Sequence, residues 1–317
     1  MTDLKQFGED VREGLSQSPK TLPSKYFYDQ RGDELFVEIM HMPEYYLTRS
    51  EYEIFRNHSA DLIEALNPDR QLGFDLIELG AGDGSKTIEL LRELLRQKYD
   101  FDYIPIDIST NTLNVLSKRM KDELPDLNLN AKEGDYFRIL EDLRNGNRPK
   151  VLLFLGSNIG NMTDDRAAGF LKRVSDVLHT GDTLLLGVDL IKSRNIVFPA
   201  YNDPAGLTRA FNLNLLSRIN RELGGNFDLD SFEHRSEYTE EEGIAKSFLM
   251  STCNQAVTIS SIAKTFHFGE GERIHTEISR KYNDEVLNRI LKDTALKVKG
   301  KLTDQEGYFA DYILERV

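Results

Sequence analysis

A glycine-rich turn near residue 80 is the first place where the residue types suggest chemistry. Gly80, Gly82 and Gly84 lie between Glu78 and Ser85, directly after an apolar run. Glycines allow a sharp turn and a close approach of a ligand, because no Cβ atom stands in the way. In open α/β sheets, ligands bind at the carboxyl ends of the strands. The turn therefore predicts a ligand site at a strand end.

Two further strand ends carry carboxylates that suit a nucleoside. Asp107 closes the next apolar run, where a carboxylate can accept hydrogen bonds from both hydroxyls of a ribose. Asp135 closes the third run and has Tyr136 beside it. This pair offers an acceptor for an adenine amino group and a ring to stack on the base. Three strand ends thus predict one nucleoside site.

The spacing of the glycines separates the candidate nucleosides. A dinucleotide fingerprint needs G-x-G-x-x-G, but the third glycine comes one place early and Ser85 occupies its position, which disfavours NAD. Lys86 and Thr87 have the spacing of the phosphate loop of ATP-binding proteins, although Ser85 again replaces a glycine. Asp189, at the end of an apolar run, resembles the aspartate of the Walker B motif in such proteins. The form E-x-G-x-G-x-G suits S-adenosylmethionine, which has no phosphates. An ATP-binding loop, a glycine turn without a ligand and a nucleoside-binding module without catalysis stay open.

The chain between about residues 71 and 191 has the pattern of the sheet that these turns require. Short apolar runs alternate there with stretches of helical period. Strands that are apolar almost throughout indicate a parallel sheet covered on both faces. We expect strands at 74–80, 103–109, 127–135, 151–158 and 182–190, and helices at 85–97, 111–124 and 164–178.

The end of the chain predicts the completion of this sheet. A helix is expected over 283–296, and strands over 295–302 and 308–317 are joined by the turn-rich segment TDQEG. The expected fold is therefore α/β, a Rossmann-like sheet with a terminal antiparallel hairpin.

Residues 8–56 and 192–281 lack the alternation and are expected to pack together as a second, interleaved lobe. Five of the 13 tyrosines lie between residues 26 and 55. Thr48 and Glu51 have the spacing of a capping box, which predicts a helix beginning there. The predicted division of the chain is 57–191 with 282–317, and 8–56 with 192–281.

Composition and charge narrow the class of protein. The chain has 317 residues, with 40 Lys and Arg against 53 Asp and Glu, and its net charge of −13 argues against nucleic acid as a partner. The single cysteine, Cys253, excludes an internal disulfide framework, and the six histidines lack metal-ligand spacing, so no metal is expected. The first residues do not resemble a signal peptide, and the apolar runs are too short to span a bilayer. We expect a cytoplasmic monomer without a membrane partner.

Seven longer stretches of the chain are similar to those of one known family: LPSKYFYDQRGDELF (22–36), MPEYYLTRSE (42–51), LIELGAGDGSKT (76–87), LFLGSNIGN (153–161), LLLGVDLIK (184–192), AYNDPAGLTRAFN (200–212) and HTEISRKY (275–282). They resemble the L-histidine Nα-methyltransferases of ergothioneine biosynthesis. The resemblance implies a class I methyltransferase fold with S-adenosylmethionine bound by 57–191 and 282–317, S-adenosylhomocysteine as a product, and a substrate-binding second lobe. It also implies methylation of the α-amino group of L-histidine, repeated three times to give hercynine. The wider family includes N-methyltransferases of prenylated tryptophan, so another amino acid or an indole amine stays open as substrate.

The resemblance also assigns roles to individual residues. Tyr28 is implied to lie close to the reacting amine as the catalytic residue, and Lys246 stands where the family places a methionine against the substrate ring. The implied cofactor contacts are Gly80, Lys86, Asp107, Asp135 and Tyr136. The implied substrate contacts are Tyr45, Asn161 and Tyr201 around the amino-acid backbone, with Glu277 and Ser279 at the imidazole.

The alternation along 275–282 gives a physical reason for two of these contacts. In a regular strand, Glu277 and Ser279 share one face with His275, while Ile274 faces the other way. A carboxylate at one imidazole N–H and a hydroxyl at the other nitrogen would favour histidine over apolar ligands of similar shape. The same pattern also fits a solvated strand face that binds nothing.

Overall fold

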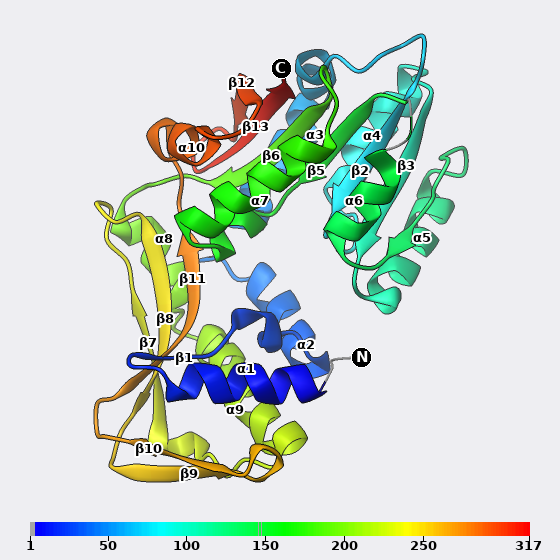
Figure 1. The fold of residues 1–317 in the computed structure, drawn as a ribbon. Helices are drawn as coiled ribbons and strands as arrows, with labels where there is room; N and C mark the ends of the chain where they lie inside the picture. The colour runs from blue at the N-terminus through cyan, green and yellow to red at the C-terminus, as the bar shows by residue number, and fades with distance from the viewer. Residues whose placement is uncertain (1–3, 145, 147) are drawn as a thin grey trace. The chain divides into compact units, whose positions relative to one another are not determined.

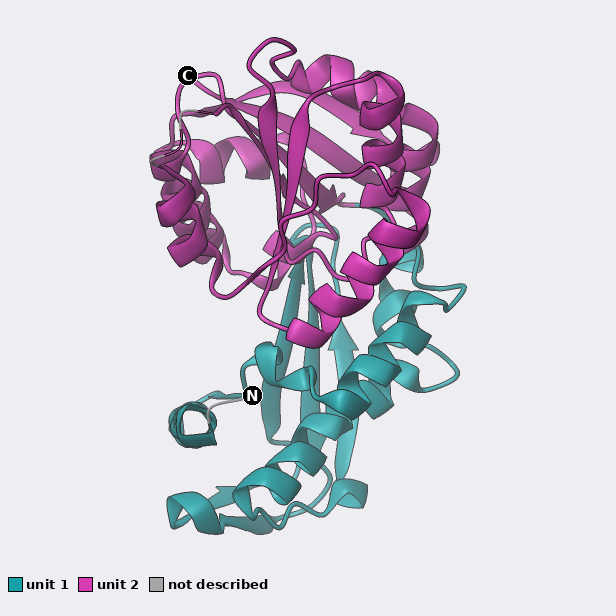
Figure 2. Cartoon of the chain, turned by 90° about the vertical axis from the view of Figure 1, so that its right-hand side faces the viewer, with its two compact units in different colours: residues 1–46, 192–280 teal, residues 47–191, 281–317 magenta. Residues whose placement is uncertain are grey.

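The computed structural model describes residues 4–144, 146 and 148–317, and the chain divides into two compact units (Figure 2). Unit 1 comprises Met1–Tyr46 and Lys192–Arg280, and unit 2 comprises Leu47–Ile191 and Lys281–Val317. The first boundary therefore falls between residues 46 and 47, where the sequence predicted it between 56 and 57. No helix within the described residues is long and apolar enough to cross a membrane.

Unit 2 is built on a seven-stranded sheet with the order β12-β13-β6-β5-β2-β3-β4 (Figure 1). Strands β2 to β6 are parallel, whereas β13 is antiparallel to both of its neighbours, β6 and β12. The strands are β2 (Phe74–Leu79), β3 (Phe101–Asp107), β4 (Lys132–Glu133), β5 (Lys150–Phe154), β6 (Thr183–Asp189), β12 (Leu296–Thr303) and β13 (Phe309–Arg316). The helices are α3 (Leu47–Leu66), α4 (Thr87–Arg96), α5 (Thr110–Glu123), α6 (Tyr136–Arg144), α7 (Asp164–Val177) and α10 (Asp284–Leu291), with the 3₁₀ turn η2 (Asn158–Asn161).

Each face of this sheet is covered by its own set of helices. Ile77 on β2 belongs to a core with α6, α7 and α10, whereas its neighbour Leu76 belongs to a core with α3, α4 and α5 (Figure 1). Because successive side chains point to opposite faces, a strand buried on both faces must be apolar throughout. The predicted parallel sheet with covered faces is confirmed.

Some predicted elements differ in extent from those observed, and one observed helix was not predicted. The third strand was expected over 127–135, but β4 has two residues, and a single bridge joins Tyr103 to Leu129 ahead of it. The last helix ends at Leu291 rather than at residue 296. Helix α6 was not predicted; its first turn is held by Asp135, whose carboxylate accepts the backbone amides of the second and third helical residues at 3.0 and 3.2 Å.

The capping-box interpretation of Glu51 is wrong. The helix predicted from Thr48 exists as α3, but it begins at Leu47, and Glu51 is only 1% exposed. The Glu51 carboxylate accepts the backbone N–H of Gly156 at 2.8 and 3.0 Å instead of capping α3. Apolar side chains of α3 join the core of unit 2, which explains why this helix belongs to the sheet rather than to the second lobe.

Unit 1 contains a four-stranded sheet of order β1-β11-β8-β7 and a separate two-stranded hairpin, β9 with β10. Helices α1 and α9 pack their apolar residues against these strands to form one core. The strands are β1 (Lys20–Thr21), β7 (Phe232–Glu237), β8 (Ile244–Ser251), β9 (Gln255–Ile259), β10 (Lys264–Phe268) and β11 (Arg273–Arg280). The helices are α1 (Leu4–Ser16), α2 (Gln30–Met40), α8 (Arg194–Tyr201) and α9 (Leu207–Leu223), with 3₁₀ turns η1 (Ser24–Phe27), η3 (Leu229–Ser231) and η4 (Ser260–Ile262).

Candidate active site

The glycine-rich turn lies at the carboxyl end of β2 in unit 2. Gly80 has φ +71°, a backbone conformation that residues other than glycine rarely adopt. Its amide donates a hydrogen bond to the carbonyl of Ile106 at 2.8 Å. A Cβ atom at Gly80 would lie 2.8 Å from the hydroxyl of Tyr136 and 3.8 Å from Nδ2 of Asn158. Glycine is therefore required both for the turn and for the close approach of Tyr136.

The two carboxylates predicted for a nucleoside lie around the same tyrosine. Burial, together with the nearby charges of Asp107 and Asp135, raises the pKa of Tyr136 to about 12. Burial also raises the pKa of Asp107, although hydrogen bonds from the backbone amides of Ser109, Gly82 and Ile108 oppose this. Asp107 thus connects the end of β3 to the glycine turn, and the three side chains predicted at separate strand ends form one group.

Lys86 extends this group toward the end of β5. Its ammonium donates to the carboxylate of Glu51, which is the same group that accepts the amide of Gly156. A Cβ atom at Gly156 would lie 3.6 Å from Nζ of Lys86 and 3.7 Å from Nδ2 of Asn158. Burial lowers the pKa of Lys86, but the charge and hydrogen bond of Glu51 outweigh it, so the pKa is raised. We call Gly80, Lys86, Asp107, Asp135 and Tyr136 the strand-end site.

The phosphate-loop alternative does not fit these partners. Lys86 is paired with Glu51, and Asp189, the counterpart of the Walker B aspartate, forms an ion pair of 2.7 Å with Lys281 in which both side chains are fully buried. The site instead combines a glycine turn, carboxylate acceptors, an aromatic ring and one ammonium. Nothing lies within 4 Å of a Cβ placed on Gly82, so the turn is open above. This donor set fits a nucleoside with an amino-acid tail, as in S-adenosylmethionine.

A second group of polar side chains forms within unit 1. The hydroxyl of Tyr201, at the end of α8, donates to Oγ of Ser279 on β11 at 2.8 Å. The hydroxyl of Ser247 on β8 donates to Oε2 of Glu277 at 3.2 Å. Although Tyr28 is 45% exposed, partial burial raises its pKa above the ordinary value, and Glu277, Asp33 and Tyr201 add to this effect. We call Tyr28, Tyr201, Ser247, Glu277 and Ser279 the hydroxyl cluster.

An aromatic layer connects Tyr45 to this cluster. The ring of Tyr28 lies 5.6 Å from that of Phe36 and 5.8 Å from that of Phe211, both in edge-to-face geometry. Phe36 in turn lies 6.2 Å from Tyr45. These separations are typical of favourable aromatic pairs. The structure therefore brings Tyr28, Tyr45, Tyr201, Glu277 and Ser279 together.

A β-bulge corrects the predicted faces of β11. Glu277 pairs with Ser247 and His275 with Phe248, because the register shifts between His275 and Glu277. Adjacent residues on β8 point to opposite faces, so Glu277 and His275 do too, contrary to the prediction. The ring of His275 stacks on Phe248 at 5.0 Å. Glu277 and Ser279 do share one face of β11, as predicted. This face is the one that also carries Ile274, whereas the sequence placed Ile274 on the opposite face.

Lys246 does not lie where the sequence comparison placed it. It is opposite Ile278 in the β8–β11 register and forms an ion pair with Glu242. Its neighbour Ser247 faces Glu277 instead. Sequence reasoning missed Ser247 because the bulge, which sets the register, leaves no signal in the residue types.

The remaining predicted contact, Asn161, belongs to unit 2. It is exposed and ends η2, a turn that follows β5 and begins with Asn158. Sequence reasoning also missed Glu51, Gly156 and Asn158, which lie next to members of the strand-end site. The segment GSN after β5 offered a signal, since it is a second polar, glycine-containing turn at a strand end.

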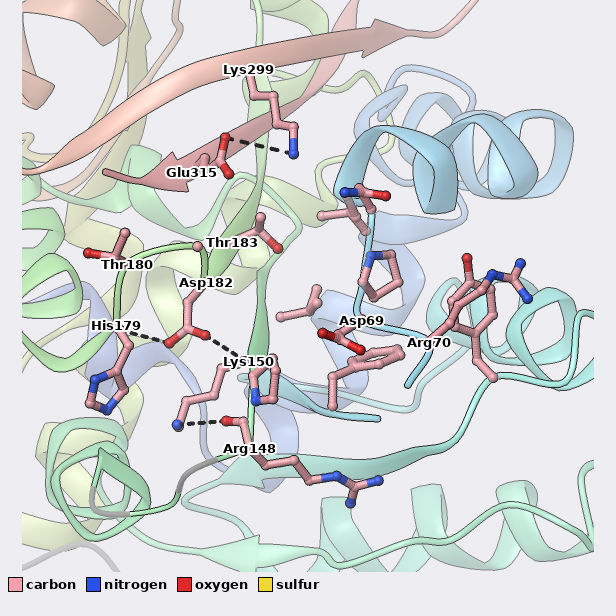
Figure 3. A pocket seen from close by; sticks show the side chains of 18 of the residues that line it. Asp69, Arg70, Arg148, Lys150, His179, Thr180, Asp182, Thr183, Lys299 and Glu315 are labelled. Carbon is pink, nitrogen blue, oxygen red and sulfur yellow. Dashed lines mark hydrogen bonds and ion pairs between the residues drawn. The ribbon is translucent and has the colours of Figure 1, made fainter. Parts of the chain in front are cut away.

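A cavity of about 800 Å³ lies at the opposite ends of the strands, where β5 and β6 begin (Figure 3). The buried Lys150 donates there to the carbonyls of Gly146 and Arg148 at 3.3 and 3.1 Å. Asp182 accepts the backbone amides of Lys150 and His179, both at 2.8 Å. These charged groups hold the loops that precede the strands. We therefore place the candidate site at the carboxyl ends of the strands rather than in this cavity.

The sheet order, the antiparallel β13 and the glycine turn after β2 together define a Rossmann-like class I methyltransferase fold. Residues 7–316 match the family described as histidine-specific methyltransferase, SAM-dependent, and the chain belongs to this family.

Named relatives agree with this assignment over nearly the full chain. A histidine N-alpha-methyltransferase of Mycolicibacterium smegmatis is 38% identical over 95% of this chain and 92% of its own. The ergothioneine biosynthesis protein 1 of Schizosaccharomyces pombe is 29% identical over 96% of this chain but only 40% of its own. An L-tryptophan methyltransferase of Psilocybe serbica is 26% identical over 94% of this chain and 90% of its own.

Proposed function

We propose that this protein methylates the α-amino group of L-histidine three times, giving hercynine. The observation that carries the proposal is the hydroxyl cluster of unit 1, in which Glu277 and Ser279 share a strand face and are held by Ser247 and Tyr201. The names of the similar histidine N-alpha-methyltransferase and ergothioneine biosynthesis protein support histidine and this product class.

The hydroxyl cluster offers complementary groups for an imidazole. The Glu277 carboxylate can accept one ring N–H, and the Ser279 hydroxyl can bond to the other nitrogen. A site built around such groups rejects ligands that lack them, because its buried polar atoms would otherwise stay unpaired. Tyr45 and Tyr201, which both belong to unit 1, are then proposed to hold the amino-acid backbone.

Tyr28 is proposed to orient the reacting amine. Its pKa is raised, so the phenol stays neutral at physiological pH and can donate or accept a hydrogen bond without acting as a strong base. A strong base is not required, because an α-amino group titrates near pH 8 in model peptides and its neutral form is available. Ordering the amine in line with the methyl group is therefore the main task.

The strand-end site is proposed to hold S-adenosylmethionine, which supplies an electrophilic methyl group on its sulfonium. Asp107 would accept the ribose hydroxyls, Asp135 the adenine amino group, and Tyr136 would stack on the base. Gly80 keeps the turn free of a Cβ atom, and Lys86 supplies one cation.

Product masses after incubation with S-adenosylmethionine test the proposal. We expect histidine to gain one, two and finally three methyl groups in a panel of amino acids that includes tryptophan. Methylation of tryptophan or another amine, with none of histidine, would overturn the substrate assignment. Cofactor binding without turnover of any amine would instead indicate a nucleoside-binding module.

A further inference from the structure

A buried ion pair beneath the strand-end site has one inner and one outer partner. Glu51 on α3 has a side chain that is 1% exposed, whereas the side chain of Lys86, before α4, is 20% exposed. The carboxylate also accepts the amide of Gly156 with both oxygens, at 2.8 and 3.0 Å. Glu51 thus ties Lys86 to the turn after β5, and Asn158 of that turn lies close to the Cβ positions of both Gly80 and Gly156.

The sheet leaves room for this carboxylate at Gly187. Gly187 on β6 pairs with Asp311 on β13, and a Cβ atom on it would lie 2.2 Å from Oε1 of Glu51 and 3.0 Å from Oδ1 of Asp311. Any larger residue at this position would displace Glu51. The space above Gly187 is therefore part of what places the Glu51 carboxylate.

Asp311 is a second buried carboxyl group, and it lies beside the same glycine as Glu51. It is fully buried, and neither of its carboxyl oxygens has a hydrogen-bond partner among the described residues. Burial and the charge of Glu51 raise the pKa of Asp311 well above its ordinary value, whereas the charge of Lys86 lowers it.

Stability alone is a weak reason for such a pair. Buried ion pairs gain little over apolar groups of similar volume, because removing both charges from water costs as much as their attraction returns. An arrangement with a buried carboxylate and a partly exposed ammonium instead holds the ammonium in one place at the surface of the site. The pair also balances a cation that would otherwise repel a sulfonium.

We propose that Glu51 is a positioning residue of the cofactor site, which fixes the Lys86 ammonium and the Gly156 amide for the amino-acid end of S-adenosylmethionine. The carboxylate at that end is the anionic group of the cofactor, and it is the group that an ammonium would recognise. This inference rests on the proposed contact between Lys86 and the cofactor, and it adds a residue of α3, to which neither the motifs nor the resemblance assigned a role at the cofactor.

A double-mutant cycle on the full-length protein tests the proposal. Glu51→Gln, Lys86→Met and the double variant are compared with wild type by calorimetric titration with S-adenosylmethionine, and the KM for histidine is measured in parallel. We expect Glu51→Gln to weaken cofactor binding about tenfold while the histidine KM changes less than twofold. The double variant should bind no more weakly than Lys86→Met, because Glu51 acts through Lys86.

Glu53→Gln is the matched control, since Glu53 lies on the same helix and accepts the amide of Gln305 away from the glycine turn. It should bind the cofactor as wild type does. Glu51→Asp keeps the charge on a shorter arm, and we expect an intermediate loss; this variant decides the matter if Glu51→Gln does not fold.

Wild-type cofactor affinity in either folded Glu51 variant, or losses that add fully in the double variant, would overturn the proposal. A parallel rise in the histidine KM would also overturn it, by indicating a general structural defect. If the wild type binds the cofactor but does not methylate histidine, the proposed function fails while the cycle at Glu51 can still be read.

Discussion

The strand-end site of unit 2 and the hydroxyl cluster of unit 1 are assembled in different ways. In unit 2, Asp107 ends β3, while Gly80 and Tyr136 come shortly after β2 and β4, so the parallel sheet alone brings them together. In unit 1, the hydrogen bond from Tyr201 to Ser279 spans 78 residues of sequence, and Ser247 meets Glu277 through a bulged register. The first arrangement follows from local motifs, whereas the second depends on tertiary packing.

The difference indicates which parts of a methyltransferase chain are free to change. A cofactor turn is constrained by backbone conformation, since Gly80 has a positive φ and Tyr136 occupies the space that a side chain would need. The hydroxyl cluster is constrained by side-chain partners, so single substitutions there can alter substrate choice without disturbing the sheet. Four experiments would break or sharpen this contrast.

Glu277→Ala is expected to have the largest effect. Removing one partner of a buried charged hydrogen bond costs about 3–4 kcal/mol, so kcat/KM for histidine should fall by roughly a hundred- to a thousandfold. Affinity for S-adenosylmethionine, measured by calorimetric titration, should change little. Glu270→Ala, at an exposed turn of the same unit, is the control. Equal losses for histidine and cofactor would mean that Glu277 is structural.

Glu78→Gln should change the pH dependence of stability. Burial raises the pKa of Glu78 from 4.5 to about 7, against hydrogen bonds from Tyr103 and Thr87 that lower it. Between these two pH values the unfolded chain releases the proton and the folded protein keeps it, so the free energy of unfolding falls as the pH rises. The loss amounts to at most about 3 kcal/mol.

The amide in Glu78→Gln cannot titrate, so the melting temperature of this variant should vary less between pH 5 and about 8 than that of wild type. Thermal unfolding across this range checks the prediction. If the melting temperatures of the two proteins depend on pH in the same way, Glu78 does not titrate near neutral pH in the folded protein.

Gly80→Ala should weaken cofactor binding about tenfold. A positive φ costs a residue with a Cβ atom roughly 1–2 kcal/mol, and the new methyl group would also displace the Tyr136 hydroxyl. Gly169→Ala is the control, because Gly169 lies exposed within α7 with no atom near its Cβ position. That change should stabilise the protein by about 0.5–1 kcal/mol. Unaltered affinity in Gly80→Ala would remove the glycine turn from the cofactor site.

Tyr201→Phe should have the smallest effect of the four. It removes the hydroxyl that donates to Ser279 but keeps the ring, and one hydrogen bond contributes about 1 kcal/mol, so the histidine KM should rise about fivefold. Tyr99→Phe is the control, because the ring of Tyr99 packs on Phe74 in unit 2, and this change should leave the histidine KM unchanged. A larger effect on cofactor affinity than on histidine would contradict the proposed division of roles.

Much of unit 2 could be predicted from the sequence because its strands are buried on both faces and its helices have one apolar stripe. The strand ends then located Gly80, Asp107 and Asp135 without any knowledge of the fold. Helix α6 escaped prediction because Asp135, interpreted as a strand end, also holds the first turn of the helix that follows. Glu51 escaped because its spacing imitates a capping box, while its partner Gly156 lies 105 residues away.

The sequence by itself determined the sheet, the glycine turn and the carboxylates that follow it, since periodicity and turn residues act over a few neighbours. Only the tertiary structure decided that Glu51 supports Lys86, that Ser247 rather than Lys246 faces Glu277, and that α3 belongs to the sheet. These outcomes depend on which distant segments pack together and on a one-residue bulge that reverses every side chain after it. Neither leaves a local pattern in the residue types.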